Sequence, residues 1–304
     1  MGRLFLGLDL RADALRAVAL ERRAGKMRLI SGRTVALPVG ALKVSAKSVN
    51  IEQPQPVSEA LREVLDPLSG YERRIALSLP LATGAVVPLE LDSPLGKPKE
   101  AIDLLRWQLK DVLPVESRQL QIDYRVVESR ENGSCRVLTA LMSREVLTSY
   151  EESLREAGYF PEKVSFHPLD LYGYYQPRHE MGGDFLLIAV EGGMISLQLF
   201  TGRTLFFQRC REGSFPDLSA VARELQRSLV ACHEVFANLS RLPLYLHSDW
   251  ENLSEMVGVV QELSGQAPIV LDPEISRMAT TPLEISSFHS RVWVTAIGAA
   301  ESLG

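Results

Sequence analysis

Two acidic residues stand where strand-like apolar runs end, each next to a turn. Asp9 lies near the end of the run 4–10, and Glu191 directly follows a second such run. A carboxylate at the end of a strand can orient Mg²⁺ through water, and small residues in the adjoining turn let backbone N–H groups approach phosphate oxygens. Gly192 and Gly193 supply a turn of that kind after Glu191. Asp9 and the glycine turn are residue types that phosphate chemistry between two loops would use, whereas the negative charge of Glu191 opposes it.

The strands expected to carry these residues occur in two similar sets. Each set is a strand–turn–strand–turn–strand pattern, at residues 4–10, 16–21 and 26–37 and again at 185–190, 195–200 and 203–208. This repetition predicts a duplicated fold. Residues 176–184 are rich in Pro and Gly and are typical of a linker. We therefore expect a first lobe at residues 1–178 and a second at 184–304.

Helical periodicity separates the remaining strand-like runs. Apolar residues recur at helical spacing in 57–68, 99–112, 143–157, 217–236, 252–263 and 293–301. Strands that alternate with helices are typical of a mostly parallel sheet covered on its faces. The sequence therefore predicts an α/β protein.

Composition and charge exclude several classes of function. The chain has 304 residues, a formal net charge of −5 and a pI near 5.7, so it has no global basic field to hold nucleic acid. Its longest apolar runs are far shorter than the ~20 residues of a membrane span, and its start does not resemble a signal peptide. The odd cysteine count without a CxxC pair fits a reducing compartment. We expect a cytoplasmic protein that reaches a membrane only through partners.

Other catalytic and metal-binding patterns are absent from the sequence. It contains no P-loop and no Gly-x-Ser-x-Gly element. Its histidines lack metal-ligand spacing and are interpreted as core or surface residues: His167, His179, His233, His247 and His289. No metal site is predicted.

Residues 8–18, Leu-Asp-Leu-Arg-Ala-Asp-Ala-Leu-Arg-Ala-Val, resemble the opening of the PilM family. These are cytosolic actin-like proteins of type IV pilus assembly, and their usual motif is Asp-Ile-Gly-Ser-Ser-Ser-x-Lys-x-Val. Further stretches agree with that family in order and spacing, at 105–127, 137–161, 206–213 and 244–298. The resemblance covers nearly the whole chain. It implies a duplicated actin-like ATPase (ribonuclease H-like) fold, with an inserted α+β subdomain at about 84–166 of the first lobe.

The first phosphate loop departs from the family motif. Asp9 is retained, but Arg11 replaces the Gly that lets the backbone close on phosphate. Ala12 follows, and Asp13 adds a repelling negative charge. The resemblance therefore implies a first loop that is poorly suited to a nucleotide.

The other two loops also depart from the family motif in ways that disfavour nucleotide binding. The family's second Asp-Ile-Gly is replaced by Ala-Val-Glu ending at Glu191, although Gly192 and Gly193 remain. The Gly-Gly expected beside adenosine is replaced by Ser248 and Asp249, and Trp250 follows. We interpret these loops as the remnant of a nucleotide site and expect no cofactor and no catalysis; bound ATP and Mg²⁺ remain the alternative.

The segment 99–114 carries more apolar residues than one buried helix face usually needs. Packing against a neighbouring sheet is one interpretation, and a groove for an extended peptide is the other. In the PilM family the cytosolic tail of the membrane protein PilN docks in the first lobe. That resemblance favours a partner site here, and we predict contacts at Trp107, Leu113 and Pro114.

The favoured hypothesis is a PilM-like scaffold of a type IV pilus assembly complex at the inner membrane. Its expected partners are the tail of a PilN-like membrane protein and the cytosolic motor ATPase. The alternatives are a nucleotide-dependent actin-like ATPase and a GspL-like component of type II secretion, which has the same fold. The altered loops oppose the ATPase. The GspL family normally continues into a membrane span, whereas this chain stops at Gly304.

Overall fold

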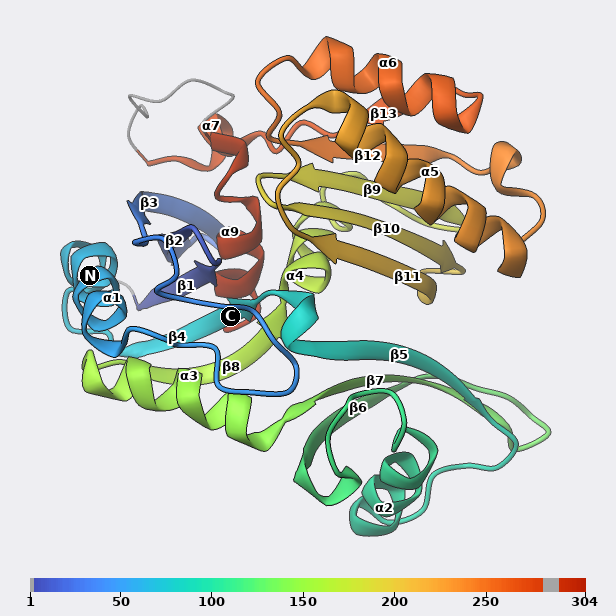
Figure 1. Ribbon diagram of the computed structural model, residues 1–304, viewed down its shortest axis with the longest axis horizontal. Coiled ribbons are helices and arrows are strands. Elements are labelled where there is room, and N and C mark those ends of the chain that lie inside the picture. Colours follow the sequence, from blue (N-terminus) through green and yellow to red (C-terminus); the bar gives the residue numbers. More distant parts are fainter. Residues whose placement is uncertain (1–2, 281–289) are drawn as a thin grey trace.

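The computed structural model describes residues 3–280 and 290–304, arranged as two lobes and a smaller subdomain (Figure 1). The sheet of the first lobe has the strand order β3-β2-β1-β4-β8. Its first three strands form an antiparallel meander, and β4 and β8 continue the sheet in parallel with β1. The strands are β1 (Leu4–Leu10), β2 (Ala14–Arg23), β3 (Lys26–Ala36), β4 (Arg74–Leu79) and β8 (Phe160–Phe166).

The second lobe repeats this arrangement. Its sheet has the order β11-β10-β9-β12-β13, again with an antiparallel meander followed by two parallel strands. The strands are β9 (Phe185–Glu191), β10 (Met194–Thr201), β11 (Thr204–Glu212), β12 (Leu244–Ser248) and β13 (Ile269–Val270). The matching order and directions confirm the predicted duplication. His289 lies outside the described residues.

Helices cover both sheets and fill the space between them (Figure 1). In the first lobe, α1 (Pro54–Ser69) and α3 (Arg144–Glu156) pack on the outer side, and α4 (His167–Tyr175) lies between the lobes. Helix α9 (Val294–Glu301) packs with α4 on the first sheet, although its residues fall in the range expected for the second lobe. In the second lobe, α5 (Leu218–Val235) and α6 (Leu253–Ser264) cover the outer face. The described residues also include the short 3-10 helices η1 (Leu81–Thr83), η2 (Ser117–Gln119) and η3 (Leu239–Arg241) and the short α-helix α7 (Ile275–Met278).

Two glycines allow α9 to pack closely against β1 and α4. A Cβ on Gly7 of β1 would lie 2.0 Å from the carbonyl oxygen of Ala296. A Cβ on Gly298 would lie 2.1 Å from the carbonyl oxygen of Asp170 in α4. Since real Cβ atoms do not approach backbone so closely, only glycine fits at these positions.

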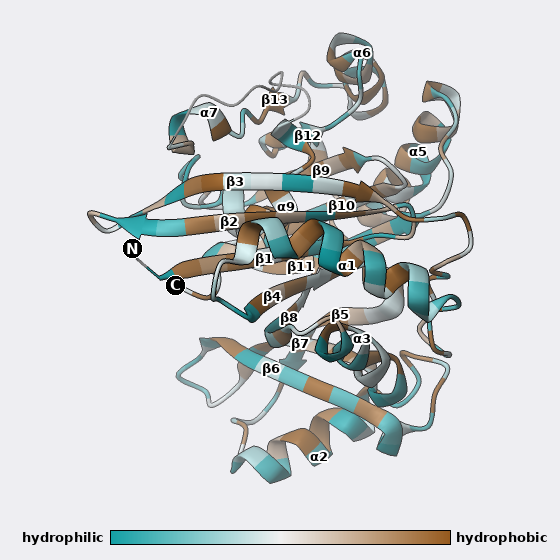
Figure 2. Ribbon diagram, turned by 90° about the vertical axis from the view of Figure 1, so that its left-hand side faces the viewer, coloured by the Kyte–Doolittle hydropathy of each residue, from teal (hydrophilic) through white to brown (hydrophobic). Residues whose placement is uncertain are grey.

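The inserted subdomain is a separate sheet, with the order β5-β7-β6, that packs against one helix. It contains β5 (Gly84–Leu91), α2 (Pro98–Gln108), β6 (Leu120–Ser129) and β7 (Cys135–Ser143). Strand β6 alternates hydrophilic and hydrophobic residues, as expected where one face of a sheet is solvated (Figure 2). This sheet ends at Ser143, earlier than the expected boundary near 166, because β8 pairs with β4 in the first lobe.

Two helices of the described residues, α4 and α7, were not predicted from the sequence, and several elements differ in length from their prediction. No helix was expected at α4, β8 is longer than the predicted run 164–166, and α2 ends at Gln108 rather than at 112. The three cysteines are free, and two of them, Cys135 and Cys232, are buried. Among the described residues, no helix combines the length and the hydrophobicity that a membrane span requires.

Candidate functional site

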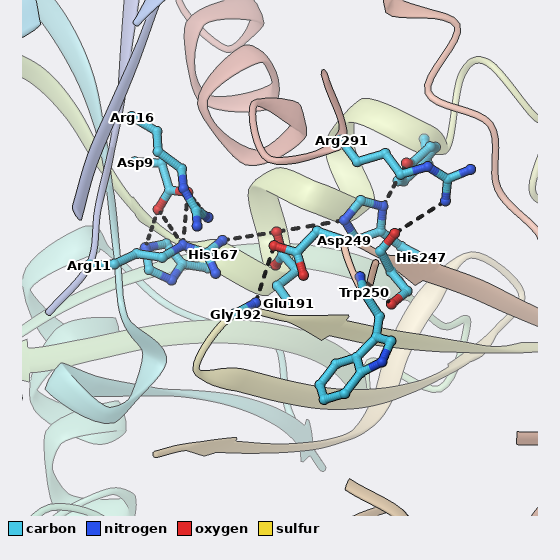
Figure 3. A network of polar contacts seen from close by, with 12 residues as sticks. Asp9, Arg11, Arg16, His167, Glu191, Gly192, His247, Asp249, Trp250 and Arg291 are labelled. Carbon is cyan, nitrogen blue, oxygen red and sulfur yellow. Dashed lines mark hydrogen bonds and ion pairs between the residues drawn. The ribbon is translucent and has the colours of Figure 1, made fainter. Parts of the chain in front are cut away.

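The two acidic residues singled out in the sequence meet at the cleft between the lobes (Figure 3). Asp9 lies near the end of β1, opposite Arg16 of β2, and Glu191 is the last residue of β9. Both carboxylates are buried, at 0% and 2% exposed. The β1–β2 turn of the first lobe and the β9–β10 turn of the second therefore bring together residues 182 positions apart, as the duplicated fold predicts.

Arg11 lies between these two carboxylates and contacts both. Its Nε donates to the carboxylate oxygens of Asp9, at 2.9 Å to Oδ2 and 3.2 Å to Oδ1. Its Nη2 donates to Oε1 of Glu191 at 2.9 Å. The Arg11 side chain is only 5% exposed. One guanidinium thus supplies the positive charge at the point where the two loops face each other.

Two histidines complete this cluster. Nε2 of His167, at the start of α4, lies 2.8 Å from Oδ1 of Asp9. Nε2 of His247, in β12, lies 3.6 Å from Oε1 of Glu191. The hydroxyl of Tyr175 lies 2.8 Å from Nδ1 of His247. Both histidines are buried, which confirms the interpretation of core histidines for this pair, but their place beside the acidic residues was not foreseen.

The cluster holds its two carboxylates in the ionised form. Burial opposes ionisation of Asp9, but Arg11 and His167 outweigh burial and keep the Asp9 pKa well below its usual range. Burial likewise opposes ionisation of Glu191, but the charge of Arg11, with His247 close by, outweighs burial and lowers the Glu191 pKa to about 2. The buried pair therefore stays negatively charged at neutral pH and needs a cation.

The third predicted loop follows β12. Asp249 turns toward the β9–β10 turn, where its Oδ2 accepts the backbone N–H of Gly192 at 3.1 Å. Burial, together with the nearby charge of Glu191, raises the pKa of Asp249. The Ser248 hydroxyl accepts the backbone N–H of Trp250 at 3.0 Å. A backbone donor that could serve a phosphate therefore serves a carboxylate of the same chain.

A cavity of about 610 Å³ adjoins the cluster. Its lining includes Arg11, Ala12 and Asp13 from the first loop and Gly192 and Gly193 from the second. The structure thus brings the predicted nucleotide-site residues together. The cavity is also lined by Glu212, whose pKa is raised by burial. Asp13 of the first lobe and Glu212 of the second therefore add acidic groups to the lining of this cavity.

The predicted partner-site residues lie away from this cluster, in the inserted subdomain (Figure 1). Trp107, on α2, is 67% exposed, and Nζ of Lys110 lies 5.9 Å from its ring centroid. Pro114 is also exposed. Leu113 is 7% exposed and belongs to the subdomain core with Leu105. Trp107 and Pro114 are therefore accessible to a partner, whereas Leu113 supports the packing beneath them.

Comparison with solved structures shows the fold of the whole chain. No protein-family model and no curated protein matches the sequence. A chain of the PilM–PilN type IV pilus biogenesis complex is similar over 98% of both chains, with 18% identity and a TM-score of 0.80. A Bacteroides thetaiotaomicron protein of unknown function with an actin-like ATPase fold covers 89% of this chain and 91% of its own, with 12% identity and a TM-score of 0.57.

A type II secretion protein is similar as well. The cytoplasmic domain of EpsL, an inner membrane component of that system in Vibrio cholerae, covers 98% of this chain and 95% of its own, with 12% identity and a TM-score of 0.53. The sequence resemblance pointed to both the pilus and the secretion protein. The chain therefore has the actin-like ATPase fold, in an arrangement that it shares over its whole length with a protein of the PilM–PilN complex.

Proposed function

We propose that this protein is a non-catalytic actin-like scaffold of a type IV pilus-type assembly complex at the inner membrane. It binds the cytosolic tail of a PilN-like membrane protein and stays in the cytoplasm, with the motor ATPase as a further partner. The observation that carries the proposal is the similarity over 98% of both chains with a chain of the PilM–PilN complex. The TM-score of 0.80, against 0.53 for EpsL, favours the pilus protein over a GspL-like secretion component.

The non-catalytic part of the proposal rests on Arg11. In a working nucleotide site, the carboxylates of the two loops would face a hydrated metal ion. Here the carboxylates of Asp9 and Glu191 both contact the Arg11 guanidinium. A bound Mg²⁺–ATP would have to displace those ion pairs and the hydrogen bond from Gly192 to Asp249. We infer that the protein works without ATP, and an actin-like ATPase is the alternative.

A peptide titration tests the partner. The full chain is titrated into a fluorescent peptide that carries the N-terminal cytosolic residues of the PilN-like protein from the same organism, and a scrambled peptide is the control. Saturable binding of the native peptide alone is expected. Equal binding of both peptides, or of neither, would contradict the pilus scaffold. Co-purification with type II secretion membrane proteins instead would favour the GspL-like alternative.

Calorimetry tests the nucleotide. The folded, nucleotide-free protein is titrated with Mg²⁺ and ATP, and its thermal unfolding is followed in parallel. We expect neither heat nor a thermal shift at millimolar ATP. Micromolar binding that is lost in Asp9→Ala would overturn the non-catalytic scaffold and favour the ATPase.

A further inference from the structure

Arg11 is the residue at which an ion pair crosses directly from one lobe to the other in the buried cluster. Its backbone belongs to the first lobe, where its N–H donates to the carbonyl oxygen of Ala14 at 3.0 Å and closes the β1–β2 turn. Its side chain reaches Glu191 of the second lobe at 2.9 Å. Because the turn fixes the backbone, the guanidinium is held over the cleft.

The contacts around Arg11 form a ring that begins and ends on α4. From His167 at the start of this helix, the ring passes to Asp9, across Arg11 to Glu191, and through His247 back to Tyr175 at the end of the helix. Figure 3 shows the ion pairs of this ring in one view. Each lobe therefore contributes one carboxylate, and a single cation lies between them.

The second positive charge near the ring, Arg16, makes its close ion pair within the first lobe, although its field also reaches Asp249 of the second lobe. Nη1 of Arg16 lies 3.7 Å from Oδ2 of Asp9, within the first lobe. Arg16 helps to neutralise Asp9, but Glu191 has its close arginine contact with Arg11 alone among the described residues. If the lobes separated, Glu191 would lose that partner.

The apolar contacts between the lobes are made elsewhere. Tyr172 of α4 stacks on Phe200 of β10, with ring centroids 4.1 Å apart, and lies 6.3 Å from the ring of Phe185. This packing joins α4 to the second sheet without involving the two turns. Beside the turns, the backbone N–H of Ala82 also donates to Oε1 of Glu212 across the lobes, at 3.3 Å. The charges at the cleft act in addition to this contact, because two buried carboxylates repel each other unless a cation lies between them.

We propose that the guanidinium of Arg11 is a permanent cation that holds the two lobes together. It takes the place that a metal–nucleotide complex would hold in this fold, so the lobes stay closed without any ligand. The scaffold then presents one fixed interlobe geometry to its partners. This inference does not depend on which partner the protein binds.

Hydrogen–deuterium exchange of the full chain tests this inference. Amides in the peptides 9–16 and 188–196 report the two turns, and amides of α1 report the core of the first lobe. In Arg11→Gln we expect exchange at both turns to be at least tenfold faster, with α1 unchanged. Glu191→Gln should act in the same direction. The double variant should exchange no faster than Arg11→Gln, because both substitutions break one contact.

The matched control is Arg209→Gln. Nη2 of Arg209 also contacts a glutamate oxygen at 2.9 Å, on Glu224, but this pair lies within the second lobe. Its loss should leave exchange at both turns unchanged. The inference is overturned if the effects of Arg11→Gln and Glu191→Gln multiply in the double variant, or if only the turn that carries the substitution exchanges faster.

If Arg11→Gln folds poorly, Arg11→Lys provides a second test. Arg11→Lys keeps the charge, but a lysine ammonium lacks the planar fork that contacts two carboxylates at once. We expect faster exchange at both turns in Arg11→Lys also, together with a larger radius of gyration in X-ray scattering. If both turns of Arg11→Lys exchange at the rates of the unmodified protein, Arg11 does not hold the lobes together.

Discussion

Asp170 is a buried carboxyl group that Arg11 does not contact. It lies on α4, and the hydroxyl of Ser78 donates to its Oδ2 at 2.5 Å. His167 on the same helix and Asp9 on β1 are the charged or titratable groups that act on it. Burial raises the pKa of Asp170 to about 7, against partial opposition from its hydrogen bonds. Asp170 is therefore a protonated neighbour of the ionised Asp9 at mildly acidic pH.

This raised pKa predicts that the protein loses stability as the pH rises from 5 to 8. The folded state holds a proton on Asp170 up to a pH of about 7, whereas the unfolded chain releases it near 3.8. The free energy of unfolding therefore falls between pH 5 and 8, by an amount on the order of 2–3 kcal/mol. Asp170→Asn should remove this part of the dependence. Urea unfolding at several pH values measures both proteins, and parallel curves would contradict the prediction.

The sequence identified the residues of the site better than it identified their contacts. Asp9, Arg11 and Glu191 were recognised because they stand at strand ends or replace residues of a known motif. From the sequence, Arg11 was interpreted only as a residue that prevents the backbone from closing on phosphate. Its pairing with Glu191 depends on how two lobes close, which no local pattern records. The same reason explains why His167 and His247 were assigned only as core or surface histidines.

At the scale of elements, strands and long helices were predictable and α4 was not. The two meanders follow from apolar runs broken by turns, and both are present. Helix α4 has the sequence His-Pro-Leu-Asp-Leu-Tyr-Gly-Tyr-Tyr and is buried on several sides between two sheets. A helix buried in this way has no polar face, so the usual apolar stripe is absent. The missed helix carries both ends of the ring around Arg11.

The contact between α4 and α9 gives a prediction about a single methyl group. A Cβ at Gly298 would meet the backbone of Asp170, so Gly298→Ala should lower the free energy of unfolding by about 3 kcal/mol. Gly258→Ala is the control, since Gly258 lies inside α6 with open space around its Cβ position. That change should raise stability by about 0.5–1 kcal/mol because alanine favours a helix. Urea unfolding separates the two, and effects of the same sign would refute the packing argument.

At the scale of the molecule, the interlobe site and the predicted partner surface are separate. The buried cluster lies between the two large sheets, whereas α2 lies on the outer side of the inserted subdomain (Figure 1). A partner peptide on α2 would therefore leave Arg11 in place. In the scaffold proposed above, a change at the buried cluster would therefore leave the predicted partner surface on α2 intact.

The last prediction concerns that surface. Trp107 is 67% exposed, so Trp107→Ala should change the free energy of unfolding by no more than about 0.5 kcal/mol. If Trp107 anchors the PilN-like peptide, the same change should weaken binding at least about tenfold, as expected for an aromatic anchor. Tyr71→Ala is the control, because Tyr71 is a fully exposed aromatic residue of the first lobe outside the subdomain. Equal peptide affinity in both variants would place the docking site away from α2, and the search would move to the other faces of the first lobe.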